Sequence, residues 1–415
     1  MQQIQELLKQ RKAKGYEIAS KGKITESNGV WVVPSQSNQR QSYKVQLTIE
    51  GAKCNCPDFA ERGIRCKHIF SVDYVIEKRL NKDGTTTVIA TKKMTYPQDW
   101  KNYTKAQCEE GTQFKVLLKD LVANVPVKVR TGAGRPSTPL NEALYCAIDK
   151  VYSMQSSRRA KSRYAEAVER QQITKAPNYN VINILLNDPE LTPILRGLLH
   201  ITALPLKSVE TKFSPDSTGF RTTQFNEYCK NKHNTKAEHK WIKCHAIIGN
   251  KTNIITDAII TDENVNDCPQ LRPLVEETAK MGFDVREVSA DKGYLSIDNY
   301  NAVQEVGGTA FIPFKKNITA NSDSSLGNRA RLWRKMFLYF QMNQEDFLEH
   351  YHNRSNVEST FMAVKMKLGD CLKSKNFVSQ VNETLCKLIA YNITVLISAM
   401  YELKIEPMLA LTQGC

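Results

Sequence analysis

The chain of 415 residues contains no apolar run long enough to cross a membrane. Its most apolar stretch, Leu388 to Tyr401, is interrupted by Asn392, Thr394 and Ser398, whereas a membrane-spanning helix needs about 20 apolar residues. We expect this stretch to form a buried core helix. The amino-terminal residues lack the basic segment and the apolar segment of a signal peptide. The sequence therefore predicts a protein with no membrane partner.

A disulfide framework is missing as well. The 11 cysteines are mostly single and lie within apolar segments, and a chain of this length can bury a sufficient core without cross-links. The sequence also shows no internal repeat and no low-complexity tract. These absences predict a globular protein of the reducing cytoplasm, with two or three domains.

Acidic residues are too few to balance the basic ones. The chain has 43 Asp and Glu against 58 Lys and Arg, which gives a net charge of +15 and a pI of ≈ 9.2. This excess favours a polyanionic partner, most simply nucleic acid. A soluble basic protein without such a ligand can have the same composition, so charge alone does not identify the partner.

The sequence divides into three predicted regions. Residues 1–95 are expected to form a small module of short strands and one helix. Residues 96–204 contain a linker and several short helices, one of them basic, which suits a helical DNA-binding region or solvated helices between domains. Residues 205–415 alternate strands with helices, with a hairpin expected around Gly249–Asn253, and this pattern predicts a mixed α/β domain.

The first region contains three cysteines and one histidine in the pattern Cys54-x-Cys56-x9-Cys66-x-His68. Three thiolates and one imidazole are the ligands of a closed tetrahedral zinc site, which stabilises a small module with a thin core. The Cys-x-Cys spacing differs from the Cys-x-x-Cys spacing of dithiol exchange. We therefore predict a structural Zn²⁺ bound by these four residues. The spacing resembles the SWIM zinc finger, whose modules bind DNA or protein.

Three acidic residues of the third region stand where α/β domains bind ligands. Asp216 lies on an expected strand, Asp291 at the carboxyl end of another, and Glu358 on an expected helix. The crevice beyond strand ends is the usual ligand site of an α/β sheet. Three carboxylates that converge there can hold two Mg²⁺ ions about 4 Å apart. Either aspartate could instead be only a turn residue.

Glu358 shares its segment with Tyr351, Arg354 and Lys365, at spacings of seven, four and seven residues. On a continuous helix the four side chains fall within roughly a 60° arc. A carboxylate, a guanidinium, an ammonium and a phenol on one stripe suit a phosphodiester and a divalent metal. The alternative is a solvated helix face with an Arg354–Glu358 ion pair.

Together these motifs resemble the DDE transposases of bacterial and archaeal insertion sequences. The resemblance rests on Asp216-Ser-Thr-Gly-Phe220, Ala290-Asp291-Lys-Gly-Tyr294 and the Tyr-x2-Arg-x3-Glu-x6-Lys spacing of the Y-R-E-K signature. It covers roughly residues 205 to 400. It implies an RNase H-like mixed sheet flanked by helices, preceded by the helical region and the zinc-finger module. It also implies metal ligands for Mg²⁺ or Mn²⁺ at Asp216, Asp291 and Glu358, and contacts to DNA phosphate from Tyr351, Arg354 and Lys365.

The activity that this resemblance implies is DNA transposition. The protein would bind the inverted-repeat ends of its own element, cleave a strand there and transfer the freed 3′ hydroxyl into target DNA. A homodimer in a synaptic complex, in the nucleoid-containing cytoplasm of a prokaryote, is expected on the same ground. Two alternatives are a zinc-finger DNA-binding regulator on an inactive transposase-like scaffold and a structure-specific nuclease.

Two features fit the resemblance less directly. Pro215 precedes Asp216 and cannot donate to a strand ladder, so we expect the strand to end or distort there. The basic segment 315–345 could contact DNA with Trp333 as a stacking residue, although a tryptophan packed in the core is the favoured interpretation.

Five further residues are weaker candidates. His239, Cys244 and His245 could form a second metal site, but a packed strand is the favoured interpretation. Asp257 and Asp262 are acidic alternatives to the three predicted carboxylates, without their motif context.

Overall fold

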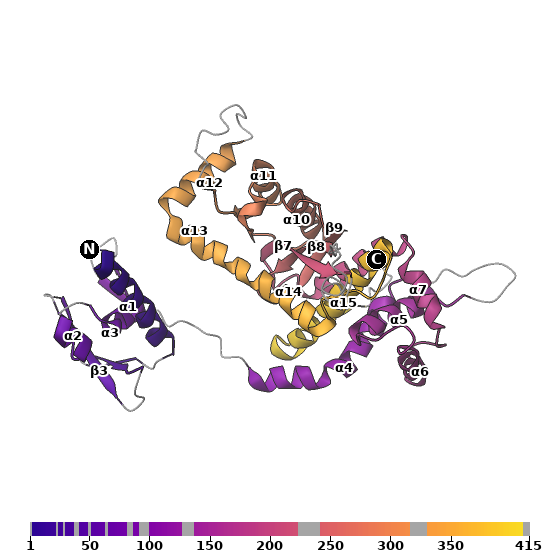
Figure 1. Ribbon diagram of the computed structural model, residues 1–415, viewed down its shortest axis with the longest axis horizontal. Helices are drawn as coiled ribbons and strands as arrows, with labels where there is room; N and C mark the ends of the chain where they lie inside the picture. The colour runs from indigo at the N-terminus through magenta and orange to yellow at the C-terminus, as the bar shows by residue number, and fades with distance from the viewer. Residues whose placement is uncertain are drawn as a thin grey trace, which may run out of the picture. The chain divides into compact units, whose positions relative to one another are not determined.

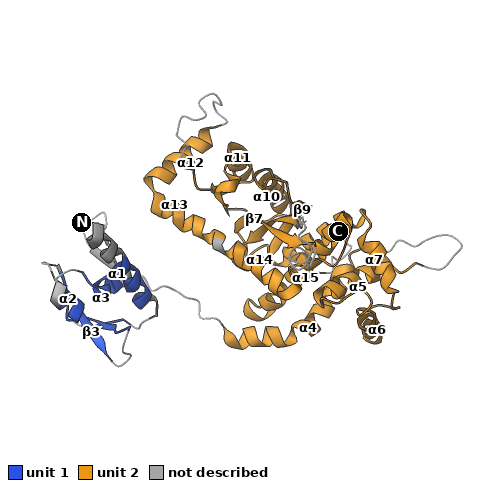
Figure 2. Cartoon of the chain, in the orientation of Figure 1, with its two compact units in different colours: residues 1–98 blue, residues 99–415 orange. Residues whose placement is uncertain are grey.

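The computed structural model describes residues 2–21, 24–27, 30–36, 41–48, 51–62, 65–80, 86–90, 99–126, 137–222, 241–315 and 330–409. The chain divides into two compact units, Met1–Gln98 and Asp99–Cys415 (Figure 2). Each unit has its own hydrophobic core. The expected boundary between residues 95 and 96 lies beside this division.

The first unit packs helices on a four-stranded antiparallel sheet. Its strands, in the order β1-β2-β3-β4, are β1 (Thr25–Ser27), β2 (Val30–Pro34), β3 (Ser42–Thr48) and β4 (Gly51–Cys54). Helix α3 (Lys67–Val75) packs on this sheet and on α1 (Gln2–Lys21), and α2 (Pro57–Arg62) follows β4. A further strand pair is formed by β5 (Ile76–Leu80) and β6 (Thr86–Ala90). The core contains Ile18, Val33, Val45, Ile69 and Val72.

The second unit is built on a five-stranded mixed sheet with the order β11-β10-β7-β8-β9. Strands β7 (Lys212–Arg221), β8 (Trp241–Gly249) and β9 (Ile255–Asp262) are antiparallel neighbours. Strands β10 (Glu287–Ser289) and β11 (Thr309–Phe311) run parallel to β7. This order and these directions are those of the RNase H-like fold, so the predicted fold class is confirmed. The expected hairpin joins β8 to β9.

The expectation that Pro215 ends or distorts its strand is wrong. Strand β7 continues to Arg221, and Pro215 pairs with Ile247 of β8. The amide of Asn250 donates to the carbonyl of Lys212, so Lys212 faces β8 and, by alternation, Pro215 faces β10. The pairing of β7 with β10 already stops at Phe213. The missing proline N–H therefore falls where β7 has no ladder partner on that side.

Helices cover both faces of this sheet (Figure 1). On β9, Asp257 is bound by Arg196 of α8 (Leu191–Ala203), whereas the neighbouring Thr256 contacts Thr278 of α10 (Leu271–Lys280). Adjacent strand residues point to opposite faces, so α8 and α10 lie on opposite sides of the sheet. Helix α11 (Ile297–Glu305) packs on α10 and β11.

Helix α15 (Phe377–Glu402) lies at the centre of the second unit. It packs against α4 (Trp100–Val122), α5 (Leu140–Tyr152), α7 (Tyr179–Leu186) and α8. The amide of Asn392 donates to the carbonyl of Ile255 and to Thr202. Among the described residues, α15 is long and apolar enough to cross a membrane, so the expectation that no run has that length is wrong. Because 83% of its apolar window is buried inside the protein, the expected core helix is confirmed.

The helices of region 96–204, including the short α6 (Lys161–Glu169), pack in the same compact unit as the sheet. Their role in DNA binding stays a prediction.

Between β11 and α15, the described residues form the helices α12 (Arg331–Met342), α13 (Gln344–Tyr351) and α14 (Ser355–Leu368). Trp333 of α12 is 5% exposed, and its ring lies 5.8 Å from that of Tyr300 and 4.9 Å from that of Phe314, between centroids. The favoured packing of Trp333 is therefore confirmed. Residues 316–329 of the basic segment lie outside the described residues.

Candidate functional site

Asp216 lies on the central strand β7, just beyond the point where β10 stops pairing with it. Its Oδ1 accepts a hydrogen bond of 2.8 Å from the amide of Ser217, and 19% of its side chain is exposed. Burial raises the pKa of Asp216, and the negative charge of Asp291 raises it further. The two carboxylates therefore repel each other electrostatically across the gap between β7 and β10.

Asp291 follows the carboxyl end of β10, where it begins the short helix η3 (Lys292–Tyr294). Its Oδ1 accepts a hydrogen bond of 2.7 Å from the amide of Lys292. Because β7 and β10 run in parallel, Asp291 and Asp216 lie toward the same edge of the sheet.

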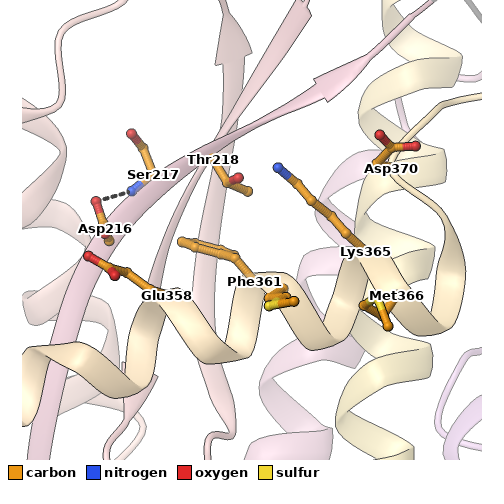
Figure 3. A pocket seen from close by; sticks show the side chains of 9 residues that line it. Asp216, Ser217, Thr218, Glu358, Phe361, Lys365, Met366 and Asp370 are labelled. Atoms are coloured by element: carbon orange, nitrogen blue, oxygen red, sulfur yellow. Dashed lines mark hydrogen bonds between the residues drawn. The ribbon is translucent and has the colours of Figure 1, made fainter.

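Glu358 lies in the first turn of α14, with 65% of its side chain exposed. Figure 3 shows its carboxylate beside that of Asp216 at one end of a groove, with Phe361 and then Lys365 toward the other end. The groove has a volume of about 520 Å³, and its remaining lining residues are Ser217, Thr218, Met362, Met366 and Asp370. Asp291 does not line this groove.

A guanidinium bridges two of the three carboxylates. Arg354 places Nη2 at 3.2 Å from Oδ2 of Asp216 and Nη1 at 3.2 Å from Oε1 of Glu358. Within the described part of the chain, the Cys/His cluster of the first unit is the one group whose ligand atoms all lie within 4.8 Å of one another. Arg354 thus joins Asp216 to Glu358, and the three carboxylates do not all lie within that distance of one another.

The four-residue stripe does not lie on one helix. Helix α13 ends at Tyr351, the turn η5 (His352–Arg354) intervenes, and α14 begins at Ser355. The side-chain amide of Asn356, in the first turn of α14, donates to the carbonyl of Asn250 just after β8. Glu358 and Lys365 stay on one face of α14, where Lys365 Nζ lies 5.7 Å from the centre of the Phe220 ring. Burial lowers the pKa of Lys365.

The four predicted zinc ligands meet in the first unit. Cys54 ends β4, Cys56 precedes α2, and Cys66 and His68 lie at the start of α3. All four side chains are buried, and their ligand atoms lie within 4.8 Å of one another. The Nδ1 atom of His68 lies 3.9 Å from the Sγ atoms of both Cys54 and Cys66.

The electrostatics of this cluster suit a metal. A hydrogen bond from the Cys54 thiol lowers the pKa of Cys66, as is usual where thiolates gather. The donor set and its spacing fit a tetrahedral zinc ion with His68 ligating through Nδ1.

Comparisons with known families agree with these two sites. Residues 208–393 match the family model of the transposase DDE domain, and residues 43–72 match that of the SWIM zinc finger. The chain carries a transposase DDE domain. The DDE transposase and SWIM resemblances are therefore confirmed.

A solved structure similar to this chain is that of a piggyBac transposase, a synaptic complex with hairpin DNA studied by cryo-EM. The two sequences are 12% identical, and the match covers 71% of this chain and 73% of that one with a TM-score of 0.35. A likeness at this TM-score carries no argument about the present protein.

The transposase domain brings Asp216 together with Glu358 and Arg354, and Lys365 lines the same groove. Tyr351, at the end of α13, packs against the hydrophobic core and interacts electrostatically with Arg354. The roles of all these residues remain predictions.

The weaker candidates have structural partners in the transposase domain. Asp257 is fully buried and bound by Arg196 and His200, and Asp262 accepts from the amide of Asn264. Cys244 and His245 are buried on β8, which confirms the packed strand, and His239 lies outside the described residues.

One cluster beside the groove was missed by the sequence reasoning. Asp267 lies 2.9 Å from Lys243 Nζ and 3.0 Å from His245 Nδ1, and it forms a hydrogen bond with Ser217 of the groove wall. Lys243 and His245 lie two residues apart on β8 and so share one face. That spacing was the available signal, but nothing in the sequence points to Asp267 as their partner.

Proposed function

We propose that the transposase domain binds Mg²⁺ or Mn²⁺ through Asp216, Asp291 and Glu358. With these ions it would cleave DNA at the ends of its own element and transfer the 3′ hydroxyl into target DNA. The proposal is carried by one observation: carboxylates from β7, the end of β10 and α14 approach one edge of the sheet, and a cationic group lies between two of them. Carboxylate oxygens are the ligands that these ions prefer, so the donor set fits.

The chain's own groups have separate tasks in this proposal. Bound divalent ions would activate the attacking water or hydroxyl and stabilise the leaving oxygen. Asp216 and Asp291 would hold them from the rigid sheet, and Glu358 from α14. Arg354 would exchange its carboxylate partners for phosphate oxygens of the DNA, and Lys365 would contact a phosphate along the groove.

For the first unit we propose a structural zinc held by Cys54, Cys56, Cys66 and His68. This unit and the helices of region 96–204 would bind the inverted-repeat ends, and two copies of the chain would form the synaptic complex. The net charge of +15 supports contact with double-stranded DNA. A prokaryotic cytoplasm, where the nucleoid lies, is the proposed location.

The test is to incubate the full chain with Mg²⁺, end-containing DNA and a target plasmid. The proposal expects cleaved ends and joined products, both abolished by Glu358→Gln and kept by Glu345→Gln, an exposed glutamate on α13. Binding without cleavage would favour the regulator, and cleavage without joining the nuclease. Cleavage that persists in Glu358→Gln would overturn the assignment of this residue.

A further inference from the structure

A second cavity lies in the helical layer of the second unit, away from the groove. It has a volume of about 510 Å³ and is enclosed by α4, α5, the end of α6 and the segment that follows α6. Asn141 and Glu142 line it from the first turn of α5, and Thr174 and Gln172 line it from the segment after α6. It shares no lining residue with the groove, so a ligand there would be independent of the proposed catalytic site.

Some polar atoms of the residues that line this cavity have hydrogen-bond partners, and others have none. Glu142 is only 9% exposed, and its Oε1 accepts a hydrogen bond of 2.8 Å from Thr174. Within the part of the chain that the structure describes, its Oε2 is buried without a hydrogen-bond partner, and so is the side-chain oxygen of Asn141. Both of these atoms are acceptors. A buried acceptor that has lost water and gained no donor costs free energy, and native proteins rarely leave one without a reason.

Two donors beside the cavity are hydrogen-bonded to other groups. The hydroxyl of Tyr145 donates to Gln172 over 2.5 Å, and Lys119 Nζ donates to the carbonyl of Gln171 over 3.0 Å. Lys115 on the same helix is paired with Glu166. None of these groups is bonded to Glu142 Oε2 or Asn141 Oδ1, so a ligand with N–H donors would satisfy these two acceptors.

The charge of the cavity defines the ligand further. An anion such as phosphate would meet the carboxylate of Glu142 and the side-chain oxygen of Asn141, both of which repel it. An ammonium or guanidinium group carries several N–H donors and a positive charge that offsets the buried carboxylate.

We propose that this cavity binds an N–H-bearing organic cation, with Glu142 as its counter-ion and Asn141 as a second acceptor. The group can come from a free alkyl polyamine or from a basic side chain of a peptide. Because Glu142 lies on α5 and Thr174 follows α6, the bound cation would hold these two segments together.

The test uses the full chain and isothermal titration calorimetry with two probes, spermidine and N-acetyl-arginine methylamide. The proposal expects one strong site for at least one probe, weakened about tenfold or more in Glu142→Gln, since a charge-assisted hydrogen bond is lost. Binding in Glu169→Gln, an exposed glutamate on α6, should equal that of the unaltered chain. Binding of spermidine alone identifies a free polyamine, and binding of the arginine probe alone a peptide side chain.

Three results would overturn the proposal: no saturable binding of either probe, equal binding in Glu142→Gln, or equally tight binding of inorganic phosphate. Asn141→Ala is a second variant that keeps the test valid if Glu142→Gln fails to fold. It removes the second acceptor without touching the buried carboxylate, and it should weaken the same probe several-fold while the melting temperature stays close to that of the unaltered chain.

Discussion

Arg354 and Asp216 are 138 residues apart in the chain, and their side chains meet over 3.2 Å at the edge of the central sheet. The same guanidinium reaches Glu358 on the next helical turn. The side chain of Arg354 is 20% exposed, so its attraction to both carboxylates is only partly screened by solvent. An internal cation thus lies between two residues that we propose as ligands of a divalent one.

Arg354→Gln should therefore strengthen metal binding by the free protein. Removal of a competing positive charge is expected to raise the affinity for Mn²⁺ roughly tenfold in the absence of DNA, as measured by electron paramagnetic resonance titration. Arg221→Gln is the matched control, because Arg221 pairs with Asp370 at the other end of the groove. Unchanged or weaker binding in Arg354→Gln would count against the proposed metal position.

Asp216→Asn should stabilise the metal-free protein at neutral pH. Burial raises the pKa of Asp216, so its ionised form is disfavoured in the folded state, and the cost appears as the pH rises through that raised pKa. The melting temperatures of the two proteins should converge near pH 4 and separate toward pH 7. Added Mn²⁺ should reverse their order by stabilising only the unaltered chain. A variant less stable at every pH would contradict this account.

Asp257→Asn should destabilise the second unit by about 2 kcal/mol, because it removes the charged acceptor of Arg196 and His200. Burial alone would raise the pKa of Asp257, but these hydrogen bonds hold it below its usual value. The contribution should be present above the ordinary carboxyl pKa and be lost as the pH falls through the folded one. Urea denaturation at pH 7 measures the free energy of unfolding. As a control, Asp262→Asn at an exposed position should change this free energy by less than about 0.5 kcal/mol.

Zinc removal should affect the first unit alone. A chelator is expected to release about one zinc per chain and to speed hydrogen exchange in residues 43–72, while exchange in α15 and the central sheet stays unchanged. Cys56→Ser should give the same local effect, and Cys108→Ser, at an exposed cysteine on α4, should give none. Slow exchange in 43–72 without bound metal would refute the zinc site.

Local patterns in the sequence predicted much of the fold and the site. The hairpin of β8 and β9, the apolar helix α15 and the Cys/His spacing each depend on neighbours within a few dozen residues. The effect of Pro215 on its strand could not be predicted, because it depends on where β10 ends. At Pro215, β7 pairs with β8 alone. The ion pair of Arg354 with Asp216 and the binding of Asp257 by α8 join segments that are distant in the sequence. No local periodicity of the sequence therefore predicts them.

The helix break after Tyr351 shows a different limit. The spacing of Tyr351, Arg354, Glu358 and Lys365 predicted one continuous helix, but α13 ends at Tyr351 and α14 begins at Ser355. Spacing in the sequence therefore does not fix the geometry of these four residues, and their roles stay predictions.

The proposed metal site is tested most directly by anomalous scattering from Mn²⁺ in crystals of the full chain with end-containing DNA. The account predicts Mn²⁺ peaks within about 2.5 Å of carboxylate oxygens of Asp216, Asp291 and Glu358, with Arg354 turned to a DNA phosphate. Mn²⁺ bound elsewhere, with Arg354 still bridging Asp216 and Glu358, would contradict it.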